Sequence, residues 1–458
     1  MSGWKTRGAH GQARIVFAIL AAVVVLALVL PAIYGSRAER IYRESVAQLS
    51  GAGRGVRLAS YRRGWFSSRA VISVSLGRGA VTLIQHVHHG PLALYNGAHV
   101  AFPVAAVVDT DPPTALENTL DKVFGEAPLR ISTVVAMSGA LDTYISRPKS
   151  ERTDPATKVN AKFGGFNLEA HSAGDTQTID GGSSGATATG VFGEAQIAGL
   201  TIHARSHRDP QSTLWLGGGE LDLARVSYSI VGGLRRAPGS GLVQDIRLTA
   251  LTEIRNGRLN ARESLSVGNL AVGALELKSA SLATGVANVP PQPVAQFKSA
   301  AVSISQSTGD PQLQSQTMQR EMVQAFVAIV KGSPIASVSL KIASARGDAA
   351  GTANFTIAPE LVDDPMLQSN DVERKDLIAQ AWKKYGQATV NAAAPVALLE
   401  HLATPAQLKR LEQNKLIVRE GDTYTCRATF KDGGWLINGH KAEPPMPTAA
   451  SGIGSRSG

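Results

Sequence analysis

The densest group of side chains that could do chemistry is Gln85-His86-Val87-His88-His89. In a strand, His86 and His88 would point to the same face, as the start of a metal site with two histidine ligands requires. A third ligand would have to come from elsewhere, and His99 and His203 are the candidates. Because nothing in the sequence fixes such an approach, we predict histidines beside a turn and no metal site.

A catalytic nucleophile is the next possibility, and Ser183 and Cys426 are the residues to consider. Ser183 belongs to the one Gly-x-Ser-x-Gly pattern. The surrounding segment, Gly174–Gly185, is rich in small polar residues and predicts an exposed loop, not the strand–turn–helix of a nucleophile elbow. Cys426 lies in a predicted strand without a catalytic cysteine signature. We therefore predict no catalytic residue and no cofactor, with a periplasmic hydrolase that leaves no motif as the alternative.

Composition limits the partners of the chain. It has 458 residues, a net charge of +10 and a single cysteine, so an internal disulfide is excluded. The 46 Lys and Arg residues are scattered among 36 Asp and Glu residues, and no basic block occurs. Aromatic residues make up 5% and do not interleave with basic ones as they do in single-strand binders. We predict no nucleic-acid partner and a basic surface near anionic phospholipid.

The apolar run Ile15–Ile33 is the candidate membrane anchor of the chain. It contains no charged residue and approaches the roughly 20 residues of a membrane-spanning helix. Lys5, Arg7 and Arg14 precede it. Since a cleavable signal has a shorter apolar region, we predict an uncleaved single-pass anchor in a bacterial inner membrane, with residues 1–14 as a cytoplasmic tail. A cleaved signal is the alternative, and basic residues on both sides leave the orientation weakly determined.

Beyond the anchor, the periodicity predicts an α+β fold that is mostly β. A long antiparallel sheet, which could be curved, would be followed by a helical segment and a C-terminal β-hairpin. The predicted regions are an N-terminal periplasmic region over 38–128, a strand-rich region over 129–310, the helical segment with the hairpin over 311–443, and a disordered tail over 444–458.

Finer patterns place individual elements. Helical spacing of apolar residues predicts helices over 311–331, 371–385 and 395–413. Alternation of apolar residues predicts strands, but it slips by one place between Leu223 and Val226. This slip predicts a bulge or a turn.

The pair Trp65 and Phe66 allows two interpretations. The aromatic rings could sit in a membrane interface or grip a lipid chain. They could instead close the first hairpin against the core. We favour the core, because most large aromatic side chains serve packing.

Three motifs together resemble a known family. Tyr61-Arg62-Arg63-Gly64-Trp65-Phe66-Ser67-Ser68-Arg69-Ala70 follows the anchor, His89-Gly90-Pro91 follows a strand, and Phe430–Gly433 leads to Leu436–Gly439. In that order they resemble the YdgA family of bacterial envelope proteins, whose molecular function is not established. The resemblance covers residues 10–443. It implies an inner-membrane protein with a periplasmic domain that could self-associate, and it supplies no catalytic residue. Here Gly433-Gly434-Trp435 makes the C-terminal turn longer than the compact turn that we would expect.

The binding motif suggested by this resemblance consists of Arg63, Gly64, Trp65, Phe66, Ser67, Ser68, His89, Gly90 and Pro91. We expect a non-enzymatic, membrane-anchored periplasmic protein that acts in envelope maintenance or assembly by binding lipid or a protein partner. Lipid handling along an apolar groove is one form of this expectation. The alternatives are the periplasmic hydrolase and a structural homodimeric scaffold.

Overall fold

The computed structural model describes residues 35–44, 46–47, 56–76, 79–90, 104–231, 239–273, 275–306, 311–363 and 377–442. The predicted anchor, the cytoplasmic tail, the C-terminal tail from 444 and residues Pro91 and His99 lie outside these ranges. Within them, no helix combines the length and the apolar character of a membrane span. The chain forms two compact units, Met1–Pro155 with Asn160–Ser184, and Ala156–Val159 with Gly185–Gly458.

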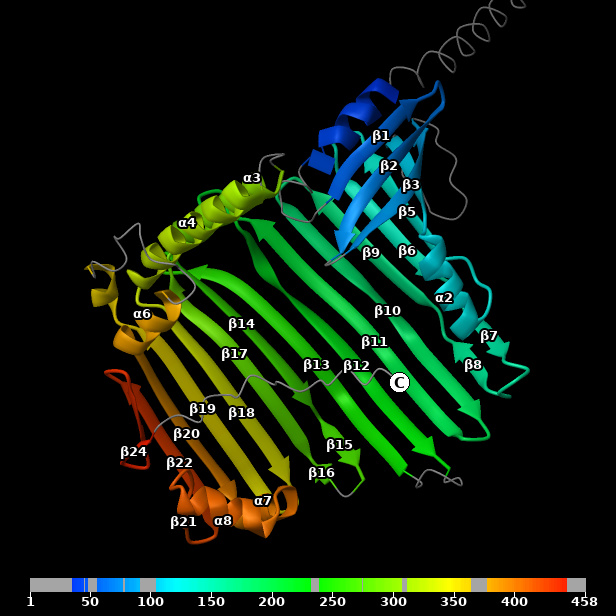
Figure 1. Ribbon diagram of the computed structural model, residues 1–458. Coiled ribbons are helices and arrows are strands. Elements are labelled where there is room, and N and C mark those ends of the chain that lie inside the picture. Colours follow the sequence, from blue (N-terminus) through cyan, green and yellow to red (C-terminus); the bar gives the residue numbers. More distant parts are fainter. Residues whose placement is uncertain are drawn as a thin grey trace, which may run out of the picture. The chain divides into compact units, whose positions relative to one another are not determined.

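The first unit is an antiparallel sheet in which each strand pairs with the next in the order that follows (Figure 1). Its strands are β1 (Val56–Arg63), β2 (Ser67–Leu76), β3 (Gly79–His89), β4 (Val104–Asp111), β5 (Arg130–Ala136), β6 (Leu141–Arg147), β9 (Phe166–Ala173) and the start of β10 (Thr176–Gly190). Helix α2 (Thr114–Phe124) follows β4, and β7 (Ser150–Thr153) pairs with β8 (Asn160–Phe163).

The core of this unit lies between the sheet and a short N-terminal helix at 35–44 and 46–47. Ala38, Tyr42 and Val46 recur every fourth residue and form one helical face. They are buried against strand residues that include Ala70 and Val87. The helix therefore docks on the sheet through its apolar stripe, as amphipathic helices do.

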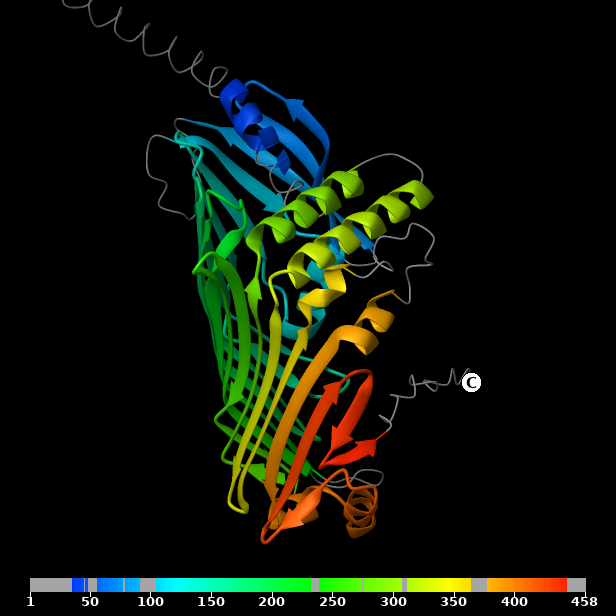
Figure 2. The same cartoon turned by 90° about the vertical axis from the view of Figure 1, so that its left-hand side faces the viewer.

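The second unit is a larger antiparallel sheet with helices at its ends, and Figure 2 shows that this sheet is curved. Its main strands pair in the order β11 (Gly193–Arg208), β12 (Trp215–Ile230), β13 (Gly239–Arg255), β14 (Arg258–Val267), β17 (Ser279–Val289), β18 (Ile335–Ser344), β19 (Gly347–Ile357), β20 (Gly386–Pro395), β22 (Thr423–Lys431), β23 (Gly434–Ile437) and β24 (His440–Ala442). The short strands are β15 (Asn269–Val272), β16 (Leu275–Leu277) and β21 (Val418–Glu420), and the helices are α3 (Pro291–Gln306), α4 (Pro311–Val330), η1 (Pro359–Asp363), α6 (Leu377–Tyr385), α7 (Val396–Leu402) and α8 (Pro405–Gln413).

The mostly β architecture with few helices is confirmed, and so is the helix predicted over 311–331. The helix predicted over 395–413 is wrong as one element, because Ala403 is extended and Thr404 caps a new helix. Helices α2 and α3 were not predicted from the sequence. The predicted loop Gly174–Gly185 is also wrong, because most of it belongs to β10.

The C-terminal hairpin is confirmed, but its turn is more compact than predicted. Lys431 pairs directly with Gly434, which leaves a two-residue loop. Both loop residues, Asp432 (φ 51°) and Gly433 (φ 75°), are left-handed. A two-residue loop with positive φ at both positions matches the twist of antiparallel strands.

The slip between Leu223 and Val226 corresponds to a kink and not to a turn, because β12 runs without a break. Ala224 lies between two residues that pair regularly with β13, Leu223 and Arg225. The residues opposite it, Gly199 in β11 (φ 68°) and Asp245 in β13 (φ 51°), have left-handed backbone conformations. Gly268, between β14 and β15, donates its backbone N–H to Gln244 O at 3.0 Å. We call Gly199, Ala224, Asp245 and Gly268 the kink line. At this line the apolar alternation shifts by one residue, as at a bulge.

Candidate functional site

The turn between β1 and β2 carries the first motif. The Gly64 N–H donates to Ser67 O at 2.9 Å. A Cβ at position 64 would lie 2.5 Å from that carbonyl oxygen, so the turn requires a glycine. Trp65 and Phe66 form the tip of this turn. We call Gly64, Trp65, Phe66 and Ser67 the aromatic tip.

His89, the last residue of β3, holds the aromatic tip in place. Its Nδ1 lies 3.1 Å from Trp65 O, and its Nε2 lies 2.8 Å from Ser68 Oγ. Because a carbonyl can only accept, Nδ1 carries the proton and Nε2 accepts the Ser68 hydroxyl. The His89 backbone N–H also donates to Phe66 O at 2.9 Å. Burial lowers the pKa of His89, which favours this neutral form.

A serine hydroxyl that donates to a histidine resembles the first two members of a hydrolase triad. Here Ser68 and His89 are only 4% and 6% exposed, and the third position is a backbone carbonyl. A substrate has no access to the hydroxyl, and Nδ1 of His89 is hydrogen-bonded to a carbonyl where a triad has a carboxylate. The Ser68–His89 pair therefore positions the aromatic tip. The sequence pattern alone did not show that these two residues form a hydrogen bond.

The structure contradicts the prediction that Trp65 and Phe66 pack in the core, because they are 58% and 55% exposed. Their backbone is bound to β3, so the side chains project from the sheet. Arg63 is exposed as well and lies 4.0 Å from the Glu39 carboxylate. Gly90 is in close contact with β4, where its N–H donates to Ala105 O at 2.8 Å.

The histidine group forms separate ion pairs. His86 Nε2 lies 3.2 Å from Asp111 Oδ2, and His88 Nε2 lies 3.3 Å from Asp109 Oδ2. The two histidines face the same side of β3 as predicted. In the described part of the chain, no three His, Cys, Asp or Glu side chains are arranged to hold a metal ion. Ser183, the other candidate nucleophile, donates to Gly165 O at 2.6 Å within the sheet.

The second unit contains a surface that the motifs did not indicate. Residues directly opposite each other in antiparallel strands lie on the same face. A row of six directly opposed aliphatic residues therefore crosses six neighbouring strands on one face. The row consists of Ile202, Leu221, Leu248, Leu265, Leu282 and Leu340, and we call it the leucine row.

One neighbouring row on this face is entirely apolar, and the other is mixed. By strand alternation, the adjacent row on one side contains Leu200, Leu223, Ile246, Val267, Ala280 and Ile342, and that on the other contains Ala204, Gly219, Ala250, Glu263, Thr284 and Val338. Beyond Leu340, the leucine row continues through Gly351 and Ala392 to Cys426. We call this side of the sheet the apolar face.

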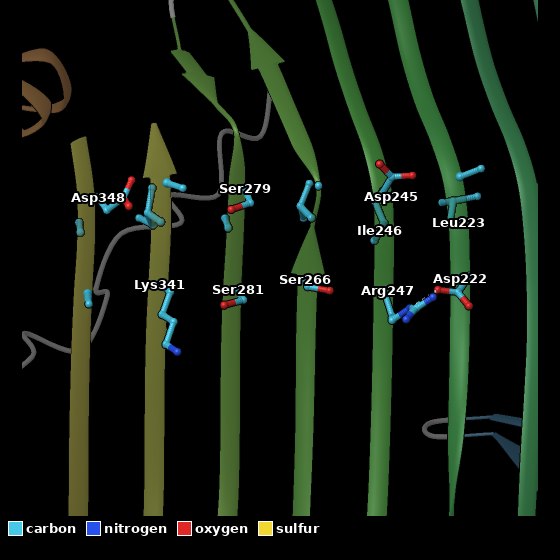
Figure 3. A pocket seen from close by; sticks show the side chains of 18 of the residues that line it. Asp222, Leu223, Asp245, Ile246, Arg247, Ser266, Ser279, Ser281, Lys341 and Asp348 are labelled. Atoms are coloured by element: carbon cyan, nitrogen blue, oxygen red, sulfur yellow. Dashed lines mark hydrogen bonds and ion pairs between the residues drawn. The ribbon is translucent and has the colours of Figure 1, made fainter. Parts of the chain in front are cut away.

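The opposite face is polar. Its row next to the leucine row contains Thr201, Asp222, Arg247, Ser266, Ser281 and Lys341. Arg247 Nε donates to Asp222 Oδ1 at 2.6 Å, and Figure 3 shows Arg247 extending toward Asp222. These strands also line a hollow of about 1000 Å³ beside the kink line, and its lining includes Asp222, Arg247 and Lys341.

Helices cover the ends of the apolar face and leave its middle open. At one end, α3 packs near Ile254, and Trp382 of α6 stacks on Phe430 with ring centroids 5.7 Å apart. At the other end, Leu408 of α8 packs on Tyr424. Between them Leu248, Leu265, Leu282 and Leu340 remain 44%, 42%, 41% and 43% exposed. The middle of the sheet is thus a single layer whose apolar side chains face solvent.

Residues 12–445 match a family described as bacterial protein of unknown function (DUF945). The chain belongs to this family. No curated protein and no solved structure is significantly similar to it. Membership in DUF945 therefore agrees with the predicted bacterial origin and adds no activity.

In this DUF945 protein, an apolar groove was expected from the sequence, but the residues that form the apolar face were not identified from it. Each strand shows the alternation that would have revealed its apolar side, such as Leu221 and Leu223 in β12. The pairing that aligns these side chains into one row is set by the register between strands, which alternation in a single strand does not fix.

Proposed function

We propose that this protein is a membrane-anchored envelope protein that binds the acyl chains of a lipid along its apolar face. The observation that supports the proposal is the leucine row, in which four neighbouring leucines are 41% to 44% exposed. Soluble monomers rarely expose large contiguous apolar patches, and such patches mark binding sites. Burial of this row against another apolar group would remove an unfavourable surface from water.

The dimensions of the row suit a lipid chain. Paired strands lie about 4.8 Å apart, so the six strands of the leucine row span roughly 24 Å. The hydrocarbon core of a bilayer is about 30 Å thick, which gives about 15 Å for the chains of one leaflet. The row is therefore long enough for an acyl chain laid across the strands. Each buried methylene would contribute about 0.8 kcal/mol.

The chemistry of the face also suits this ligand. An acyl chain has no polar group, and the leucine row offers none. The ends of the face, capped by α6 and α8, limit the opening to a strip, whereas an obligate protein interface is usually a broad patch. We place the protein in the inner membrane with its bulk in the periplasm, supported by the apolar run Ile15–Ile33 and the resemblance to the YdgA family.

Native mass spectrometry of the full chain, released from mild detergent with added bacterial phospholipid, tests the proposal. We expect a protein mass with one or more bound phospholipids that survive moderate collisional activation. A lipid-free dimer would contradict lipid binding and favour the homodimeric scaffold. A lipid-free monomer that hydrolyses an ester or peptide substrate would favour the periplasmic enzyme.

A further inference from the structure

We infer that the aromatic tip of the first unit inserts into the surface of an anionic phospholipid bilayer, as a second membrane contact beside the anchor. The inference goes beyond acyl-chain binding by the apolar face, which lies in the other unit. It rests on the proposed anchoring through residues Ile15–Ile33. The closing experiment distinguishes failure of the anchor from failure of the tip insertion.

The tip lies close to Gly35, the first described residue of the N-terminal helix. A Cβ built on Gly35 would lie 2.6 Å from Nδ1 of His89. The same nitrogen lies 3.1 Å from Trp65 O. One imidazole thus separates the start of the N-terminal helix from the aromatic tip. Since Gly35 follows Ile33 by two residues, at most about 7 Å of extended chain separates Gly35 from the last residue of the apolar run.

The structure holds the aromatic side chains in an exposed position. Gly64, Ser68 and His89 fix the backbone of the tip by hydrogen bonds, and two of these residues are buried. This ordering keeps Trp65 and Phe66 exposed. Burying polar groups to hold two large aromatic side chains in water has no benefit for stability. Trp and Phe side chains at the headgroup level of a bilayer would gain from this arrangement.

Charge next to the tip points to an anionic surface. Arg62 and Arg69 are directly opposite each other in the β1–β2 pair, and both are exposed. Like charges in this position repel each other and destabilise a sheet. Arg63 follows Arg62 in the chain and is exposed, 4.0 Å from the Glu39 carboxylate, so Arg62 and Arg69 are the pair that repels. Phosphate groups of anionic lipids would relieve the repulsion and add attraction for each arginine near the surface.

Position-specific fluorescence on the full chain in bilayers tests this inference. In a Cys426→Ala background, single cysteines are introduced by Phe66→Cys, Ser36→Cys and Leu116→Cys and labelled with an environment-sensitive fluorophore. The bilayers contain phosphatidylethanolamine, phosphatidylglycerol and spin-labelled lipid. Leu116 is the matched control, because it is 45% exposed on α2 in the same unit. Helix α2 follows Asp111 at the end of β4, about 17 Å along the strand from Ala106, which pairs with the tip-holding residue His89.

We expect a blue shift and a roughly twofold or greater loss of fluorescence at position 66, and no loss at 116. Replacing phosphatidylglycerol by phosphatidylcholine should reduce the loss at 66. Quenching at 36 without quenching at 66 would overturn the inference and leave the anchor intact. Absence of quenching at both positions would overturn the anchor and the tip together. Quenching at 66 alone would support the tip and refute the anchor.

Discussion

The leucine row provides a quantitative test of acyl-chain binding. The perturbation is the double variant Leu265→Gln with Leu282→Gln, because these residues are directly opposite each other at the centre of the row. They are 42% and 41% exposed in the free protein. Full burial of a leucine side chain is worth about 2 kcal/mol, so a bound chain that covers the remaining two-fifths would gain about 0.8 kcal/mol at each position.

Glutamine removes this gain and presents an amide to the acyl chain. Loss of about 1.6 kcal/mol from the two leucines, together with about 0.7 kcal/mol for each amide left without a partner, gives about 3 kcal/mol. This corresponds to about a hundredfold weaker binding. The assay is titration of the full chain in detergent with a fluorescent phospholipid analogue, and a competing natural phospholipid confirms that the site is shared.

The chain offers a matched control in the same two strands. Ser266 and Ser281 are directly opposite each other, one residue along from the leucines, and lie on the polar face. Ser266→Gln with Ser281→Gln introduces the same side chains and should leave affinity within about twofold, since no acyl contact is lost. Equal lipid affinity of the leucine and serine variants would refute the reasoning, provided that both give the thermal transition of the unmodified protein.

Three further predictions concern residues that hold the aromatic tip or cover the end of the apolar face. Burial lowers the pKa of His89 below its ordinary 6.5, so its contribution to stability should be complete above pH 6.5 and lost as pH falls below that value; the urea midpoint of the unmodified chain should fall with acidification more steeply than that of His89→Gln. Gly90→Ala should destabilise the first unit by about 3 kcal/mol in urea titration, because its Cβ would lie 1.8 Å from Val104 O. Trp382→Ala should cost about 3 kcal/mol and increase hydrogen exchange in α6, because the ring stacks on Phe430; unchanged exchange would contradict that contact.

Individual helices and strands were predicted from the sequence better than the pairing between strands. The helix over 311–331 was evident, because its apolar residues recur at helical spacing over a long segment. Strand alternation was equally local, and the C-terminal hairpin was predicted from its turn residues. The leucine row depends on pairs such as Leu282 with Leu340, which lie on strands separated by two helices along the chain. Local patterns contain no information on that pairing.

The candidate site shows the same limit. The motif residues Ser68 and His89 were singled out separately, but the hydrogen bond between them depends on the β2–β3 pairing. The exposure of Trp65 and Phe66 contradicts a general preference for packing aromatic residues. Such departures from a local rule are expected where a surface serves binding.

The register of the leucine row has a consequence for how the protein tolerates insertions and deletions. Because side chains alternate strictly, inserting one residue into β14 would send the apolar residues beyond that point to the polar side and interrupt the row at one strand. Inserting two residues would restore the alternation. At the kink line, the alternation of side chains shifts by one residue in three adjacent strands at matching positions, Gly199, Ala224 and Asp245. The pairing between these strands is therefore kept. We therefore expect these strands to tolerate insertions or deletions of an even number of residues. An odd number should be tolerated only where neighbouring strands change length at matching positions.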